Sequence, residues 1–135
     1  QRIAYNAIPS VVYTNPEIAC VGLTEKDLNE IKEGDFAPSM STDEPFVPYE
    51  VHKLPMTYSG RFVAENEGEM GLCKVIVDKR SKTVMGVHMI GNPCSEFVAA
   101  ASFAVRMGYT VGEFKQVVFP HPTVAEVLRE VIMEA

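Results

Sequence analysis

The alternation of apolar and polar residues predicts β-strands in both halves of the chain. Ser10–Thr14 is β-branched and aromatic, the turn signal Asn15-Pro16 follows it, and Ile18–Leu23 has the pattern of a second strand. Further along, Leu72–Val77 and Thr83–Ile90 flank a charged turn and predict a β-hairpin with a loop of about five residues. We therefore expect a sheet of antiparallel strands.

Helical signals lie between and after these strands. Thr24 is placed as the N-cap of a charged helix, and Gly34 is placed to end it. An alanine-rich helix is predicted over residues 94–107, ending at Gly108, and its apolar residues share one face. These residues are Phe97, Val98, Ala101, Ala104 and Val105.

The last predicted helix has the most regular pattern. Apolar residues recur at helical spacing from Val124 to Ile132. Thr123 as N-cap, with Glu126 three residues later, fits a capping box. Residues 35–70 are broken by prolines and predict at most a strand over Asp35–Thr42. The fold class that follows is α+β, an antiparallel β-sheet flanked by helices.

Composition limits the function classes. The 135 residues carry a net charge of −6 and are 47% hydrophobic, which suits a single domain over residues 1–135. The acidic balance disfavours nucleic acid as a partner, and no apolar run is long enough for a membrane span. Because no glycine-rich loop joins a strand to a helix, we expect the chain itself to bind no dinucleotide.

The cysteines and two of the histidines carry little chemistry. Cys20, Cys73 and Cys94 are far apart and lack zinc-ligand spacing, so we expect no metal site, buried inert thiols and a reducing compartment. A hydrolase pairing Cys94 with His121 is conceivable, but no feature places the two together. His88 is expected to be a half-buried strand residue, and His52 supports no prediction.

One stretch, Phe119–Glu126, concentrates reactive potential. His121 lies between two prolines that restrict the backbone, and Glu126 falls in the first turn of the next helix. A carboxylate that holds one imidazole nitrogen fixes the tautomer and raises the basicity that acid/base catalysis needs. In the alternative interpretation Glu126 only completes a capping box and His121 is a turn residue.

The segment His121-Pro122-Thr123-Val124-Ala125-Glu126 resembles the C-terminal His-Pro-Thr-x-x-Glu motif of the pyridine nucleotide-disulfide oxidoreductases. Other segments agree in order and spacing, and the resemblance covers nearly the whole chain. They are Ile8–Ala19, Val21–Glu25, Gly71–Ile76, Gly86–Gly91 and Ser95–Val98. Dihydrolipoamide dehydrogenases are the family members that the chain resembles most, and this likeness favours the catalytic interpretation of His121.

The resemblance implies the interface domain of a homodimeric flavoenzyme. His121 and Glu126 would reach the partner subunit's redox disulfide and flavin, with Pro122 near that flavin. His121 would take a proton from the substrate dithiol, Glu126 would orient the imidazole, and electrons would pass through FAD to NAD⁺. The family also implies a cis bond between His121 and Pro122. The substrate would be lipoamide, free or on a carrier protein.

Two positions depart from the family pattern. Phe119 stands where the nearest members usually have a second histidine. The stretch Gly34–Arg61 is longer than expected by about a dozen residues, and it includes the proline-interrupted segment, to which no role is assigned. Two other functions stay open: the same domain of a glutathione-reductase-like enzyme that uses NADPH, and an interaction module without catalysis.

The same reasoning predicts that the chain is part of a longer enzyme and that this enzyme is a dimer. The chain begins at Gln1 without a methionine, so we expect a piece of a longer enzyme whose FAD and NAD domains are absent here, and an inactive fragment that binds neither cofactor. The helix at 94–107 and the apolar stripe at 124–132 offer more apolar surface than one small sheet needs, which predicts a symmetric homodimer. We expect a cytoplasmic location, or the mitochondrial matrix in a eukaryote.

Overall fold

A computed structural model of the chain describes residues 3–31 and 47–135. It contains a five-stranded sheet in the order β1-β2-β5-β4-β3, with every pair of neighbours antiparallel. The strands are β1 (Ser10–Val12), β2 (Ile18–Gly22), β3 (Tyr49–Leu54), β4 (Leu72–Asp78) and β5 (Val84–Ile90). The predicted α+β class is confirmed, and so is the β4–β5 hairpin at the centre of the sheet.

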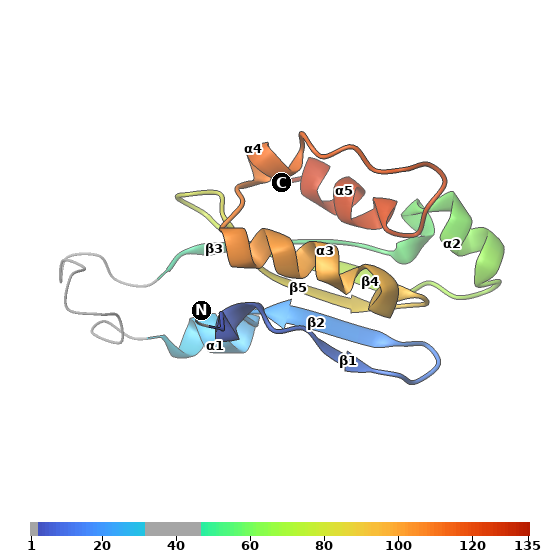
Figure 1. Cartoon of the computed structure of the whole chain (residues 1–135), viewed down its shortest axis with the longest axis horizontal. Coiled ribbons are helices and arrows are strands. Elements are labelled where there is room, and N and C mark those ends of the chain that lie inside the picture. The colour runs from blue at the N-terminus through green and yellow to red at the C-terminus, as the bar shows by residue number, and fades with distance from the viewer. Residues whose placement is uncertain (1–2, 32–46) are drawn as a thin grey trace.

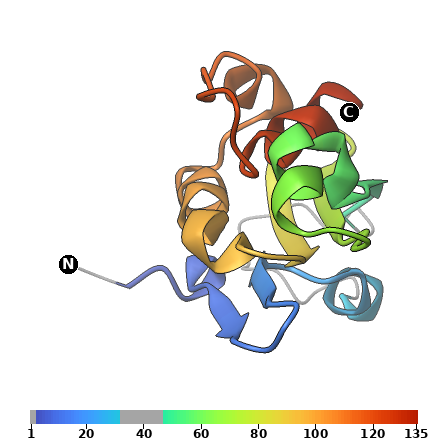
Figure 2. The same cartoon turned by 90° about the vertical axis from the view of Figure 1, so that its right-hand side faces the viewer.

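Helices cover the sheet unequally. They are α1 (Glu25–Glu30), α2 (Gly60–Glu65), α3 (Cys94–Met107), α4 (Val111–Phe114) and α5 (Glu126–Met133). α3 packs on β2 and β5, whereas α5 packs on β3 and β4, so the two share one face of the sheet (Figure 1). α1 lies on the opposite side (Figure 2). Within the described residues, no helix has the length and apolar character that crossing a membrane requires.

The core lies between the sheet and this pair of helices. Side chains that alternate along the central strands point into it, including Val75, Val77, Val87 and Met89. From α3, the five residues of the predicted apolar face are all buried. Gly108 ends α3 in the left-handed conformation with φ +64°, as its position predicted.

One prediction about the first half of the chain needs correction, and two elements there were not predicted. Thr24 does cap α1, accepting a hydrogen bond from the Asp27 N–H, but the helix ends at Glu30, before Gly34. Gly34 and the predicted strand Asp35–Thr42 lie outside the described residues. β3 and α2 were not predicted at all. β3 is an edge strand between Pro48 and Pro55, and α2 has only six residues, so neither gives a long periodic pattern.

The predicted capping box at the start of the last helix is wrong. α5 begins at Glu126 itself, its N-cap is Ala125, and no side chain caps it. The Thr123 hydroxyl instead donates to the carbonyl of Pro120, 2.9 Å away, because it belongs to the turn before the helix.

The apolar stripe of α5 is also not the surplus surface that was inferred for it. Its residues are fully used inside this one chain, against β3 and β4. They are Val124, Val127, Leu128, Val131 and Ile132, none more than 5% exposed. Any apolar surface available for a second copy therefore lies elsewhere.

Candidate active site

His121 and Glu126 form a pair at one end of the molecule. Nδ1 of His121 lies 2.9 Å from one carboxylate oxygen of Glu126 and 3.0 Å from the other. Glu126 opens α5, whose apolar face is anchored in the core, so its carboxylate is held on a rigid element. Because Glu126 faces the histidine rather than the helix N-cap, the structure supports pairing and not the capping-box alternative.

The pairing determines which imidazole nitrogen is available. An ionised carboxylate can only accept, so the Nδ1–H of His121 donates to Glu126 and Nε2 carries the free lone pair of the neutral ring. Nε2 has no hydrogen-bond partner in the described part of the chain. The imidazole is 81% exposed, whereas the Glu126 side chain is only 17% exposed. The arrangement presents an oriented proton acceptor to whatever binds at this surface.

The loop that carries His121 is tied to its surroundings by its backbone. The His121-Pro122 bond is cis, as the resemblance implied. Ser59 donates from Oγ to the Thr123 carbonyl at 2.9 Å, and Arg61 donates from Nη1 to the Pro122 carbonyl at 3.3 Å. Neither residue was singled out from the sequence. A serine three residues before the apolar pair at 62–63 is the N-cap signal that indicates α2.

The three cysteines do not join this site. Burial raises the pKa of the Cys73 thiol to about 12 and that of Cys94 to about 11, and it also raises the pKa of Cys20. Cys94 is fully buried and donates from Sγ to the Glu17 carbonyl. No contact links it to His121 within residues 3–31 and 47–135, so the structure does not bring together the Cys94–His121 pair of the hydrolase hypothesis.

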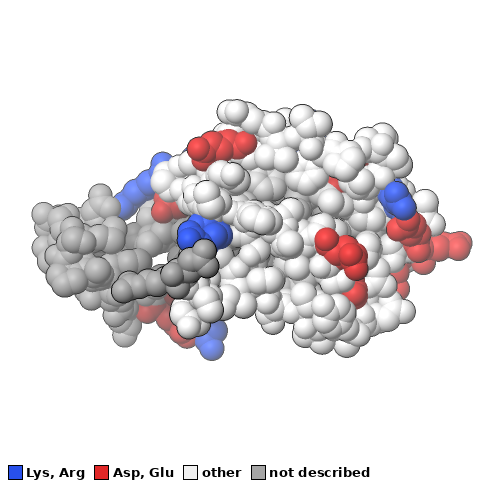
Figure 3. Space-filling view, viewed as in Figure 1, with Lys and Arg blue, Asp and Glu red and all other residues white. Residues whose placement is uncertain are grey.

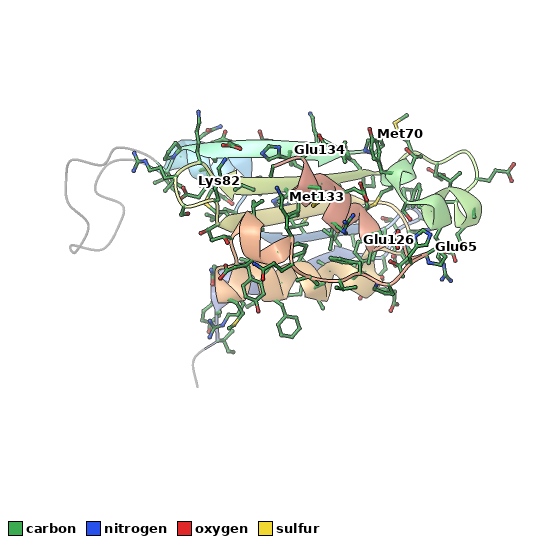
Figure 4. The ribbon with its side chains drawn as sticks, turned by 90° about the horizontal axis from the view of Figure 1, so that it is seen from above. Glu65, Met70, Lys82, Glu126, Met133 and Glu134 are labelled. Atoms are coloured by element: carbon green, nitrogen blue, oxygen red, sulfur yellow. The ribbon has the colours of Figure 1, made fainter. Side chains whose placement is uncertain are left out.

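The other histidines have local partners. His88 is half-buried in β5 and donates from Nε2 to the Leu23 carbonyl at 2.9 Å, which confirms the prediction of a satisfied strand residue. His52 lies on β3 with Nε2 3.0 Å from Glu50, which also accepts from Lys82 at 2.6 Å. Lys82, which pairs with Glu50, lies at the opposite end of the molecule from Glu126, the partner of His121 (Figure 4).

The N-terminus of the longest helix does not fit the pyrophosphate of a flavin or nicotinamide dinucleotide. The obvious place for a pyrophosphate is the N-terminus of α3, the longest helix. There the Glu17 carboxylate already accepts from the Ser95 hydroxyl at 2.9 Å and from its backbone N–H at 3.4 Å. A second anion would be repelled. No group of three or more metal-ligating side chains occurs in the part of the chain that the structure describes.

Comparison with known families decides the wider assignment. The sequence model of the pyridine nucleotide-disulphide oxidoreductase dimerisation domain matches residues 8–132. The chain belongs to this family. The match runs from before β1 to Ile132 in α5, and the chain is thus a dimerisation domain of an oxidoreductase of this class.

Two curated relatives above 30% identity are named dihydrolipoyl dehydrogenases. The mitochondrial protein of Caenorhabditis elegans is 37% identical over 99% of this chain. Dihydrolipoyl dehydrogenase 3 of Pseudomonas aeruginosa is 35% identical over 94% of it. Both matches span only 24% of the relative, so the chain covers about a quarter of their length.

Solved structures agree on the fold. LpdA from Mycobacterium tuberculosis superposes with a TM-score of 0.79 at 22% identity, over 99% of this chain and 26% of that one. RclA from Escherichia coli, described as an HOCl-induced flavoprotein disulfide reductase, gives 0.76 at 21% identity, over 93% of this chain and 26% of that one. At such identities the likeness is evidence for the fold only.

Proposed function

We propose that this chain is the dimerisation domain of a dihydrolipoyl dehydrogenase, in which His121 and Glu126 are the acid/base pair. The observation that carries the proposal is the contact between His121 Nδ1 and both carboxylate oxygens of Glu126, with Nε2 left exposed. The relatives named dihydrolipoyl dehydrogenase support the choice of reaction. The single domain spans residues 1–135.

The reaction is the oxidation of a dithiol. Dihydrolipoamide loses two electrons and two protons to become the cyclic disulfide lipoamide, while NAD⁺ takes up two electrons and one proton as NADH and one proton goes to solvent. The thiol must be deprotonated before its sulfur can attack a disulfide. Nε2 of His121 takes this proton, and the Glu126 carboxylate stabilises the imidazolium that forms, as a charge-assisted hydrogen bond does.

FAD and NAD⁺ would be held mainly by other parts of the enzyme, because Glu17 occupies the helix N-terminus that a pyrophosphate would need. FAD supplies the electron transfer between the dithiol and NAD⁺. Pro122, next to the histidine, would lie near the flavin of the partner subunit in such a dimer. Free thiols at Cys20, Cys73 and Cys94 suit a reducing compartment, and we place the enzyme in the cytoplasm or the mitochondrial matrix.

A homodimer completes the site. The pair needs a dithiol/disulfide centre opposite Nε2, and the described residues of this chain do not supply one. The face over α3 and the loop before α5 bears few charged side chains (Figure 3). Large apolar side chains lie exposed on it: Phe103, Met107, Tyr109, Val117 and Val118, from 37% to 91% exposed. We assign this face to the second copy, because an exposed apolar patch of this kind marks an interface.

The test uses the full-length gene product that carries these residues. His121→Gln removes the proton acceptor without adding charge, so turnover of dihydrolipoamide should fall by about 10² to 10⁴-fold. Electron transfer from NADH to an artificial acceptor needs no thiol deprotonation and should stay within about twofold. Equal dihydrolipoamide turnover by the variant and the natural enzyme refutes the catalytic role. Preference for NADPH with glutathione disulfide would move the enzyme to that substrate class.

A further inference from the structure

Ser59 is the one buried polar side chain in the described part of the chain, at 1% exposure. Its hydroxyl makes two hydrogen bonds. Oγ accepts from the backbone N–H of Phe62 at 3.2 Å, which caps α2, and donates to the carbonyl of Thr123 at 2.9 Å. Buried hydroxyl groups in folded proteins nearly always have hydrogen-bond partners, and Ser59 has two. The second of these bonds joins Ser59 to the loop of His121, 64 residues further along the chain.

Arg61 adds a second tie from the same helix. Nη1 donates to the Pro122 carbonyl at 3.3 Å, while Nε pairs with Glu65 at 2.7 Å, which holds the guanidinium in place. Glu65 and Glu126 lie at the same end of the molecule (Figure 4). α2 therefore holds the two carbonyls that directly follow His121.

The helix α2, which makes these hydrogen bonds to the histidine loop, is itself fixed in the core. Phe62 is fully buried in the core, as is Met56 in the turn before α2. Asn66, at the end of α2, donates from Nδ2 to the Asn92 carbonyl, which joins the helix to the start of α3. A loop held by such an element keeps one position relative to α5, which carries Glu126.

We propose that Ser59, assisted by Arg61, is a positioning residue for His121. The inference rests on the proposed function. The imidazole has one protein partner in the described residues and is 81% exposed, so little packing fixes its place. The direction of Nε2 is then set by the backbone of residues 121–123 and by Glu126. The backbone carbonyls of this segment accept hydrogen bonds from Ser59 and Arg61, two residues outside the His–Glu motif.

Ser59→Ala in the full-length enzyme removes the tie to Thr123 together with the cap of α2. We expect kcat for dihydrolipoamide to fall by on the order of 10- to 100-fold, the cost of a catalytic group displaced by about 1 Å. KM should change little, and transfer from NADH to an artificial acceptor should stay within about twofold. Ser59→Thr keeps the hydroxyl that makes both hydrogen bonds and should restore most of kcat.

The matched control is Thr24→Ala. Thr24 caps α1, a helix of the same six-residue length on the other side of the sheet, by accepting from the Asp27 N–H at 3.0 Å. Thr24→Ala also removes the side-chain cap of a helix, at an exposed position and without touching the histidine loop, so kcat should be unchanged. If kcat falls as much in Thr24→Ala as in Ser59→Ala, the loss of activity in Ser59→Ala comes from lower stability of the fold, and the inference is overturned.

Other outcomes separate the two proposals. If His121→Gln abolishes dihydrolipoamide turnover and Ser59→Ala does not lower it, the positioning role is wrong and the proposed function stands. If His121→Gln is fully active, the proposed function fails first. Should Ser59→Ala not accumulate as a flavoprotein, Arg61→Ala decides. Arg61 is at the surface, and its loss should lower kcat severalfold with the acceptor activity kept; unchanged kcat refutes the inference.

Discussion

The bond between Glu126 and His121 permits a graded prediction. Truncation of the carboxylate in Glu126→Ala removes a charge-assisted hydrogen bond in which Nδ1 faces both oxygens at 2.9 and 3.0 Å. Hydrogen bonds to charged groups are worth about 1.5–3 kcal/mol. If that energy is realised only when the imidazole is protonated, it adds directly to the barrier. Each 1.36 kcal/mol is a tenfold change in rate, so kcat should fall by about 10- to 150-fold.

Glu126→Gln sharpens the test. The amide oxygen still accepts from Nδ1–H, but without charge, and neutral hydrogen bonds are roughly half as strong as charged ones. The loss is then about 0.75–1.5 kcal/mol, or about 4- to 12-fold in kcat. The exposed imidazole allows water to compete, which favours the lower end of each range unless a partner subunit covers the site.

The assay is steady-state oxidation of dihydrolipoamide by the full-length enzyme, with transfer from NADH to an artificial acceptor as the internal control. The expected order of activity is natural enzyme, Glu126→Gln, Glu126→Ala and His121→Gln, from highest to lowest. Natural activity in Glu126→Ala would refute the orienting role. Activity as low as that of His121→Gln would mean that the carboxylate takes part in the proton transfer itself.

Three further predictions concern the fold. Burial raises the thiol pKa of Cys94 to about 11 and that of Cys73 to about 12. Both thiols of the folded protein should therefore react with a disulfide reagent at pH 8 at least about 100-fold more slowly than in denaturant. Rapid reaction of either thiol in the folded protein would contradict this. Leu128→Ala, at a site 1% exposed, should lower the free energy of unfolding in urea by about 2–5 kcal/mol, whereas Met70→Ala, at a site 69% exposed (Figure 4), should change it by less than about 0.5 kcal/mol. A hydrogen bond from Lys82, and a weaker effect of one from His52, lower the pKa of Glu50 in the folded protein. The ionised Glu50 carboxylate therefore stabilises the fold above its unfolded pKa of about 4.3, and this stabilisation is lost as the pH falls through the lower pKa of the folded state. Glu50→Gln should therefore flatten part of the acid limb of a stability-against-pH curve, and an unchanged limb would argue against the ion pair.

Local pattern was sufficient where an element is long and one-sided. The apolar spacing along α3 and the glycine in the left-handed conformation at position 108 predict both the helix and its end. The β4–β5 hairpin follows in the same way from two apolar runs around a charged turn. The pattern did not predict β3 and α2, because both have only six residues. β3 also lies between two prolines, and α2 is held by tertiary contacts such as the burial of Phe62.

The sequence predicted the residues of the candidate site but not which of two contacts Glu126 makes. The spacing of His121 and Glu126 is compatible with either a capping box or a side-chain pair, and the sequence alone does not separate the two. What separates them is where Thr123 donates, since its hydroxyl bonds the Pro120 carbonyl and leaves the helix uncapped. Ser59 was out of reach because its bond to Thr123 joins positions 64 apart.

Phe119 explains how one loop serves both the site and the proposed dimer face. Its ring packs against Phe114 of α4, with centroids 5.9 Å apart, and with Val118 and Pro120 it lines an apolar groove of about 360 Å³. A histidine at this position would bring a polar ring to an apolar contact, so the departure from the family pattern fits the packing around it. The loop is then fastened by apolar contact before His121 and by backbone hydrogen bonds after it. A second copy that covers the groove would lie beside the exposed imidazole, which is where a base supplied to a partner's dithiol must be.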